Sequence, residues 1–335
     1  MSHNNTSTRA FKTVNNHLNE SRRKVVIAIF VVVALILAAF ATLIIGKIVS
    51  QLPEKPINPT NGDFTYIPKE GGDVKLGNLL SINDDFKYEI PSDFSKMINL
   101  YEAQRKSEYD ELTSINNKLT YSLSRVDIVL EADTFTKFNQ MVLDYCKSLD
   151  NVTSANSNCI SNLVVTWGGY SADTVGEYAT DVPNFGNGYY DHGLGTTLTL
   201  KMFEPSTPIT EQILKRNYAW LYENAHKYGF IIRNPESCQN HTGISSDKRI
   251  HLRYVGEEHA TYIHQNGICF EEYLELLRTK HNSPDKALTV KIGDKSFYIY
   301  YVKYTGNPTS VPVFKNADYT ISGDNMNGFI VTVEK

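Results

Sequence analysis

Two histidines are the residues of this sequence best suited to hold a metal ion. His192 lies in the glycine-rich stretch "YYDHGLGTTLTLK" (189–201), directly before alternating apolar and hydroxyl residues. His251 lies near the start of another apolar segment, "IHLRYV" (250–255). A histidine in a turn that leads into a strand suits the first ligand of a metal-dependent hydrolase, which also needs a carboxylate nearby. Threonines, among them Thr199, follow His192 where such a carboxylate would be expected, so it is open whether this site can hold a metal ion.

Short apolar segments around these histidines predict the strands of a sheet. The strongest is "NLVVTWGGY", a buried strand that ends in a Gly-Gly turn. The expected strands lie within residues 162–170, 195–203, 230–234 and 250–255.

Helical periodicity predicts three longer helices between or after these strands. Residues 131–149 carry an apolar stripe that should pack on the sheet. Residues 211–228 form a second helical pattern, which Gly229 closes as a C-cap. In the third stretch, 257–277, His259 and His264 are five residues apart and share no helix face, so we expect both to lie at the solvated surface.

An apolar run of 21 residues, from Val25 to Ile45, is long enough to span a bilayer. The basic triplet at 22–24 favours a cytoplasmic N-terminus and an extracytoplasmic main domain. A cleaved signal peptide is the alternative, because 39–41 (Ala-Phe-Ala) resembles a cleavage site, but the apolar run continues past it. The net charge of −4, with both signs interspersed, gives no basic surface for nucleic acid.

Four cysteines would then lie where disulfides persist. They are Cys146, Cys159, Cys238 and Cys269. Three pairings are open, of which Cys146 with Cys159 is favoured by proximity, and unpaired buried thiols are an equal alternative. None of the spacings matches a zinc motif.

Four segments in this order resemble the VanY-type D-alanyl-D-alanine carboxypeptidases, zinc peptidases of the LAS type that act on peptidoglycan. They are "WGGYS" (167–171), "DHGLGTTLTLK" (191–201), "NAHKYGFIIRNP" (224–235) and "HLRYVGEEHATYIHQNGICFEEYL" (251–274). The resemblance implies an α+β fold with a small antiparallel sheet flanked by helices. It also implies a zinc ion and, as partners, cell-wall stem peptides that end in D-alanine, or other cell-wall enzymes.

The resemblance and the composition together divide the chain into five parts. We expect a cytoplasmic N-terminus (1–24), a transmembrane anchor (25–45), an extracytoplasmic spacer (46–74), the VanY-like domain (75–284) and a C-terminal β extension (285–335).

In the family, the first two zinc ligands lie in a Ser-x-His-x-x-Gly-x-Ala-x-Asp pattern. This sequence places Tyr190, His192, Gly195 and Thr199 on that pattern, so Thr199 stands where the family has aspartate. The third ligand position falls on His251. Two neutral imidazoles without a carboxylate would hold zinc weakly or not at all.

The catalytic glutamate of the family, three residues before the third ligand, is Lys248 in this chain. A shift of one residue would bring Asp247 to that position, but a displaced, shorter carboxylate is a poor general base for one particular water. Asp191 is a second candidate for the lost carboxylate, although neighbouring residues on a strand point to opposite faces.

The arginine that grips the substrate carboxylate in the family is replaced by Ser171, which carries no charge. Trp167, Tyr170 and Tyr190 remain as candidate substrate-binding residues of the cleft, with core packing as the alternative for Trp167.

Two functions from different classes follow. The first is a membrane-anchored extracytoplasmic pseudoenzyme that binds stem peptides or a cell-wall partner without cutting them. The second is an active zinc carboxypeptidase in which Asp247 or Asp191 restores the lost carboxylate. A purely structural partner domain is a third alternative.

Overall fold

The computed structural model describes residues 63–80, 97–115, 118–149, 163–169, 190–201, 215, 218–233, 235–242 and 249–335. The chain divides after Lys55 into two units, and all described residues belong to the second, Pro56–Lys335. No helix in the described ranges is long and apolar enough to cross a membrane. Residues 25–45, where the anchor is expected, lie outside these ranges.

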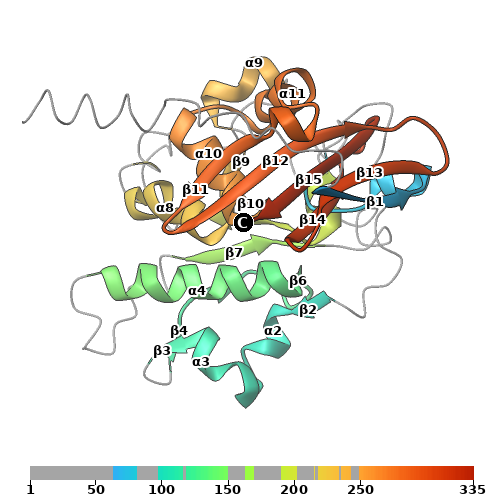
Figure 1. Ribbon diagram of the computed structural model, residues 1–335. Coiled ribbons are helices and arrows are strands. Elements are labelled where there is room, and N and C mark those ends of the chain that lie inside the picture. Colours follow the sequence, from blue (N-terminus) through green and yellow to red (C-terminus); the bar gives the residue numbers. More distant parts are fainter. Residues whose placement is uncertain are drawn as a thin grey trace, which may run out of the picture. The chain divides into compact units, whose positions relative to one another are not determined.

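A five-stranded sheet forms the centre of the region around His192 and His251 (Figure 1). Its strands, in spatial order, are β5 (Ser122–Leu123), β7 (Val164–Trp167), β8 (Thr197–Lys201), β10 (Ile250–Tyr254) and β9 (Phe230–Arg233). The β5–β7 pair is parallel and the other pairs are antiparallel. The expected mixed helix and sheet fold is confirmed. The small sheet was expected to be antiparallel, and its β5–β7 pair is parallel.

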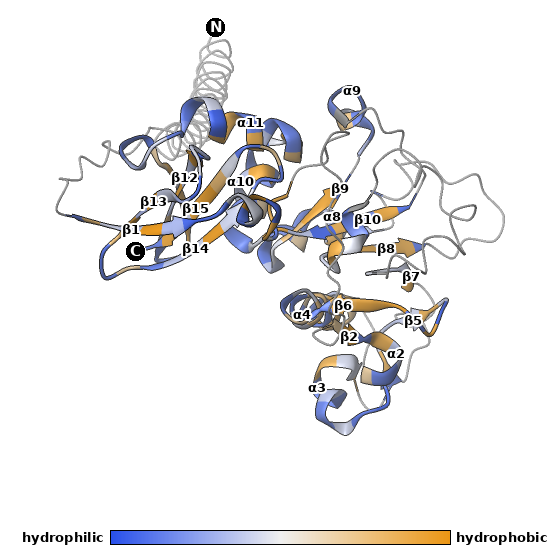
Figure 2. Cartoon of the chain, turned by 90° about the vertical axis from the view of Figure 1, so that its right-hand side faces the viewer, coloured by the Kyte–Doolittle hydropathy of each residue, from blue (hydrophilic) through white to orange (hydrophobic). Residues whose placement is uncertain are grey.

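One face of this sheet packs on the long helix α4 (Ala132–Ser148), as its apolar stripe predicts. Phe135, Phe138 and Met141 of the helix are fully buried in the same cluster as Leu198 and Leu252 of the sheet. Figure 1 shows α4 running along the sheet beside β7, and Figure 2 shows largely hydrophobic colouring on β9. Alternate side chains of each strand therefore pack into the core against α4, and the side chains between them point to the opposite face of the sheet.

Shorter elements precede and follow α4. The remaining strands before the sheet are β2 (Met97–Asn99), β3 (Ser114–Ile115), β4 (Lys118–Leu119) and β6 (Val129–Glu131). The helices outside the C-terminal region are α2 (Leu100–Ala103), α3 (Asp110–Thr113), α8 (Ala219–Asn224) and α9 (Gln239–Thr242), with 3-10 helices η2 (Gly71–Lys75), η4 (Ser107–Tyr109), η6 (Tyr190–Leu194), η7 (Ala225–Tyr228) and η8 (Glu236–Cys238). Gly229 ends η7 in the left-handed conformation, with φ of 83°, as predicted.

The third predicted helical stretch is two helices, α10 (Glu257–Asn266) and α11 (Phe270–Lys280). Gly267 ends α10 with φ of 61°, and Cys269 caps the start of α11. The expectation that His259 lies at the surface was wrong, because this side chain is 2% exposed. Its ring nitrogens lie 2.7 Å from the Tyr273 hydroxyl and 3.0 Å from the Thr332 hydroxyl.

A four-stranded antiparallel sheet follows α11 and the 3-10 helix η9 (Pro284–Lys286). Its strands, in spatial order, are β11 (Leu288–Ile292), β12 (Lys295–Lys303), β15 (Gly328–Glu334) and β14 (Asp318–Gly323). Residues of α10 and α11 share a buried cluster with β11, β12 and β15. His259 adds a polar link from α10 to β15.

The strand β13 (Thr309–Phe314) pairs with β1 (Phe64–Lys69), far away in the sequence. Next along the chain, η2 packs on β14, and the Leu76 carbonyl accepts a hydrogen bond from the Gly323 amide. Strand β1 lies inside the 46–74 segment for which a spacer was predicted. The structured chain therefore starts before Lys75, because these residues find hydrogen-bond partners near the C-terminus that local composition does not reveal.

Candidate functional site

The face of the five-stranded sheet opposite α4 carries a row of side chains that crosses four strands. Trp167 of β7 pairs with Thr199 of β8, Thr199 pairs with His251 of β10, and His251 pairs with Arg233 of β9. Directly opposed residues of antiparallel strands point to the same face, so these four side chains lie side by side. We call Trp167, Thr199, His251 and Arg233 the polar row.

His192 reaches this row from the turn that leads into β8. It lies in η6, and its carbonyl accepts a hydrogen bond from the Gly195 amide at 2.9 Å. Gly195 has φ of 70°, and a Cβ atom there would lie 2.6 Å from the Met97 sulfur. The positive φ favours glycine in this tight turn, and the His192 ring reaches Thr199 of β8.

The Thr199 hydroxyl lies between the two histidine rings. Its Oγ1 atom is 2.9 Å from His192 Nε2 and 3.0 Å from His251 Nδ1. The ring centroids are 6.0 Å apart. A hydroxyl can donate to one ring and accept from the other, so two neutral imidazoles of complementary tautomers satisfy it completely. Thr199 and His192 are both buried.

These donors do not fit a zinc ion. In a tetrahedral site with bonds of about 2.0–2.1 Å, neighbouring donor atoms lie about 3.3 Å apart. The contacts of 2.9 and 3.0 Å are instead those of ordinary hydrogen bonds. The Thr199 hydroxyl also brings no negative charge to offset the double positive charge of a zinc ion. Within the described ranges, no group of three or more metal-binding side chains could hold a metal ion.

Asp191 is bound elsewhere and is a poor substitute for the lost carboxylate. Its Oδ2 accepts a hydrogen bond from Arg233 Nε at 2.7 Å, and its Oδ1 accepts one from Arg253 Nη1 at 2.8 Å. Arg233 also pairs with Glu271 of α11. Asp191 lies in a 3-10 helix, not on a strand as expected. Because both of its carboxylate oxygens are bound by buried guanidinium groups, Asp191 is poorly placed to act as a third metal ligand.

Trp167 ends the row at β7 and is only partly buried. The guanidinium carbon of Arg125 lies 4.5 Å from the centroid of its indole ring. Packing into the core around α4 therefore does not describe this side chain. It forms a platform for a cation at the edge of the polar row.

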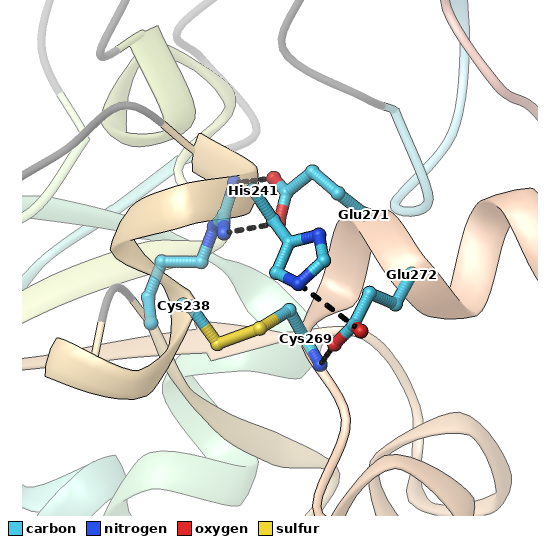
Figure 3. Close-up of a disulfide and its surroundings, with 6 residues drawn as sticks. Cys238, His241, Cys269, Glu271 and Glu272 are labelled. Carbon is cyan, nitrogen blue, oxygen red and sulfur yellow. Dashed lines mark hydrogen bonds and ion pairs between the residues drawn. A yellow bond between two sulfur atoms is a disulfide. The ribbon is translucent and has the colours of Figure 1, made fainter.

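A disulfide fixes the segment that follows β9. Cys238 in η8 is bonded to Cys269, the residue that caps α11 (Figure 3). Beside this bond, His241 Nε2 lies 3.2 Å from Glu272, and the Cys269 amide donates a hydrogen bond to Glu272 at 2.8 Å. The sequence left this pairing open. Cys146 is disulfide-bonded as well.

A model of the VanY D-alanyl-D-alanine carboxypeptidase family matches residues 174–257. A D-alanyl-D-alanine carboxypeptidase of Enterococcus faecium is 31% identical over 268 residues, which cover 78% of this chain and 76% of that protein. The chain belongs to the VanY family.

A solved structure supports the fold. The vancomycin resistance D,D-dipeptidase VanXYg, in complex with a D-Ala-D-Ala phosphinate analogue, aligns with 81% of this chain and 99% of its own at a TM-score of 0.58 and 20% identity. A vancomycin resistance D,D-pentapeptidase VanY in complex with Zn(II) aligns with 46% of the chain and 87% of its own, with 24% identity and a TM-score of 0.30.

The VanY pattern assigns its three ligand positions to His192, Thr199 and His251, and the structure brings these side chains together. Tyr190 is the first residue of η6. The other predicted site residues lie outside the described ranges, and their roles stay predictions; they are Tyr170, Ser171, Asp247 and Lys248.

The sequence analysis missed the arginines behind the site. Arg253 is fully buried, and its Nη2 donates to the Leu80 carbonyl at 2.6 Å. It lies two residues after His251, on the same face of β10. This spacing was a usable signal, but its partners Asp191 and Leu80 are distant in sequence. Together these contacts hold the His192 turn against β9 and β10.

Proposed function

We propose that this VanY-family protein is membrane-anchored, lies outside the cytoplasm, and binds D-alanine-terminated stem peptides without cutting them. The observation that carries the proposal is the Thr199 hydroxyl, hydrogen-bonded to His192 and His251 at the three ligand positions of the family.

The hydrogen-bonded arrangement argues against zinc catalysis for a physical reason. The aspartate of the family supplies both a bond and a negative charge, and a threonine hydroxyl supplies no charge. To bind a metal, both rings would also have to give up their hydrogen bonds to Thr199. When bound in a carboxypeptidase, zinc polarises the peptide carbonyl and lowers the pKa of a water molecule. The residues present here can still orient a peptide by hydrogen bonds and apolar contacts.

Two features support the extracytoplasmic location. The apolar run 25–45 follows a basic triplet, which is typical of an anchor with a cytoplasmic N-terminus. The Cys238–Cys269 disulfide suits an oxidising compartment. A partner enzyme of the cell wall is an alternative occupant of the same cleft.

The second candidate function is an active zinc D-alanyl-D-alanine carboxypeptidase, which the E. faecium relative of that name favours. It would need a carboxylate from outside the described residues, such as Asp247. Because Asp191 is bound by Arg233 and Arg253, it is a weaker candidate for this role.

Two measurements on the detergent-solubilised full chain separate these functions. We expect less than one tenth of an equivalent of zinc by elemental analysis, even after incubation with zinc and desalting. We also expect no release of D-alanine from a pentapeptide ending in D-Ala-D-Ala, but saturable binding of the same peptide. One equivalent of zinc, lost in the His251→Ala variant, together with D-alanine release would refute the proposal.

A further inference from the structure

We propose that Arg125, stacked on Trp167 at the end of the polar row, binds the terminal carboxylate of the peptide ligand. This inference rests on the proposed function, because it names the residue that would recognise a peptide ending in a free carboxylate. It assigns to the segment after β5 a recognition role that the family pattern does not give it.

The position of Arg125 follows from the strand register. Its guanidinium carbon lies 4.5 Å from the Trp167 ring centroid. Trp167 is directly opposite Thr199 in the β7–β8 pair, and such Cβ atoms lie about 4.5–5.5 Å apart. Arg125 therefore lies beyond Thr199 on this face, with the Trp167 side chain between them. A short peptide that lies along the polar row would bring its end to this guanidinium.

The other arginines of this face are already committed to structure. The side chains of Arg233 and Arg253 are 2% and 0% exposed, and both bind Asp191. Releasing either one would leave a buried charge without its partner, which is costly. Arg125 is more accessible than either of them, with a side chain that is 18% exposed.

Asp127 shows that the Arg125 fork is arranged for a carboxylate. Arg125 Nε donates to Asp127 Oδ1 at 2.9 Å, and Nη2 pairs with Oδ2. These hydrogen bonds hold the pKa of Asp127 below its usual value, so the pair is charged at neutral pH. The Asp127 side chain is 46% exposed. Because the Asp127 side of the pair is open to solvent, a ligand carboxylate can take the place of Asp127 on the guanidinium.

The chemistry of the neighbouring groups fits the end of a D-alanine peptide. A planar guanidinium binds a carboxylate through two parallel hydrogen bonds. The indole of Trp167 offers an apolar surface to a methyl side chain. Ser171, the position of the family's carboxylate-binding arginine, carries no charge. Arg125 would restore the missing positive charge from the segment that follows β5.

The test is peptide binding by the full chain in detergent, measured by isothermal titration calorimetry. The probes are N-acetyl-lysyl-D-alanyl-D-alanine and the same peptide with a C-terminal amide. We expect the wild type to bind the acid at least tenfold more tightly than the amide. Arg125→Ala should lose that tenfold preference, and Arg125→Lys should retain part of it.

Arg105→Ala is the matched control, because Arg105 also stacks on an aromatic ring, with its guanidinium carbon 4.8 Å from the Tyr101 centroid. It should bind both peptides like the wild type. Unchanged acid preference in Arg125→Ala, with an unfolding midpoint like that of the wild type, overturns this inference alone. If the wild type binds neither peptide, both this inference and peptide binding as the proposed function fail.

Discussion

At the scale of single residues, Thr199 lies with a ring nitrogen on either side at hydrogen-bond distance. We expect Thr199→Asp to create a zinc site, because a carboxylate at this position adds the missing charge between two nitrogens that already converge. Zinc affinity should rise about a hundredfold or more relative to the wild type. Titration with zinc, followed by calorimetry on the full chain, measures the change.

Thr199→Asn is the control for this substitution, because it has the shape of aspartate without the charge. It should bind zinc no better than the wild type. Equal zinc affinity in the Asp and Asn variants would show that charge at this position does not limit metal binding, contrary to our explanation.

The sequence allowed part of this residue-scale description to be predicted. The resemblance to the VanY pattern, with its first two ligands seven residues apart, placed His192 and Thr199 in one site. It could not identify the binding of Asp191 by Arg233 and Arg253, because those contacts span 42 and 62 residues. Such contacts depend on which strands become neighbours, and local periodicity does not determine that order.

At the scale of elements, the Cys238–Cys269 bond closes a loop with a sequence separation of 31 residues. Removing it in the Cys238→Ser, Cys269→Ser double variant should lower the free energy of unfolding by about 3–4 kcal/mol, because the unfolded chain gains conformational freedom. Urea unfolding under oxidising conditions measures this loss. A change below about 1 kcal/mol would indicate that the neighbouring ion pairs hold α9 and α11 together without the bond.

The contact between η7 and α10 should make stability depend on pH. The rings of His226 and His264 stack with centroids 4.0 Å apart. Burial, followed by the charges of His264 and Lys227, lowers the pKa of His226 to about 4. Between pH 6.5 and 4 the unfolded chain therefore binds a proton that the folded chain does not. Stability from this group is complete above pH 6.5 and is lost as the pH falls toward 4.

The His226→Gln variant tests this dependence. Between pH 7 and 5, its unfolding midpoint should fall by about 2 °C less than that of the wild type, because exposure of the pair limits the effect. Parallel curves for the wild type and His226→Gln would exclude the stacked pair as the cause.

Helical periodicity predicted burial correctly where a helix packs through one apolar face. It failed where a residue is buried by a partner distant in sequence. The apolar stripe of 131–149 gave α4 almost to its ends. Local helix periodicity wrongly placed His259 at the surface. It could not reveal the partner Thr332, which lies 73 residues away on β15. Burial, by disfavouring the charged ring, lowers the pKa of His259, so the ring stays neutral between α10 and the C-terminal sheet.

At the scale of the whole molecule, we expect the full chain to stay with membranes after an alkaline carbonate wash. Protease added to intact protoplasts should digest its main domain. Leu35→Arg with Leu37→Arg should release the protein, because each arginine near the middle of a spanning helix costs about 2.5–3.5 kcal/mol. Leu35→Ala with Leu37→Ala is the control. Protection from protease in the wild type would refute the predicted orientation.

The pairing of β1 with β13 has a consequence for how the protein is made. Phe64 opposes Phe314, and Lys69 opposes Thr309. A ribosome produces β1 long before its partner strand, so this pair cannot close until synthesis is almost finished. Premature termination before Thr309 would leave the early strand without its hydrogen bonds. A truncation that removes β13 should therefore also destabilise β1 at the start of the domain.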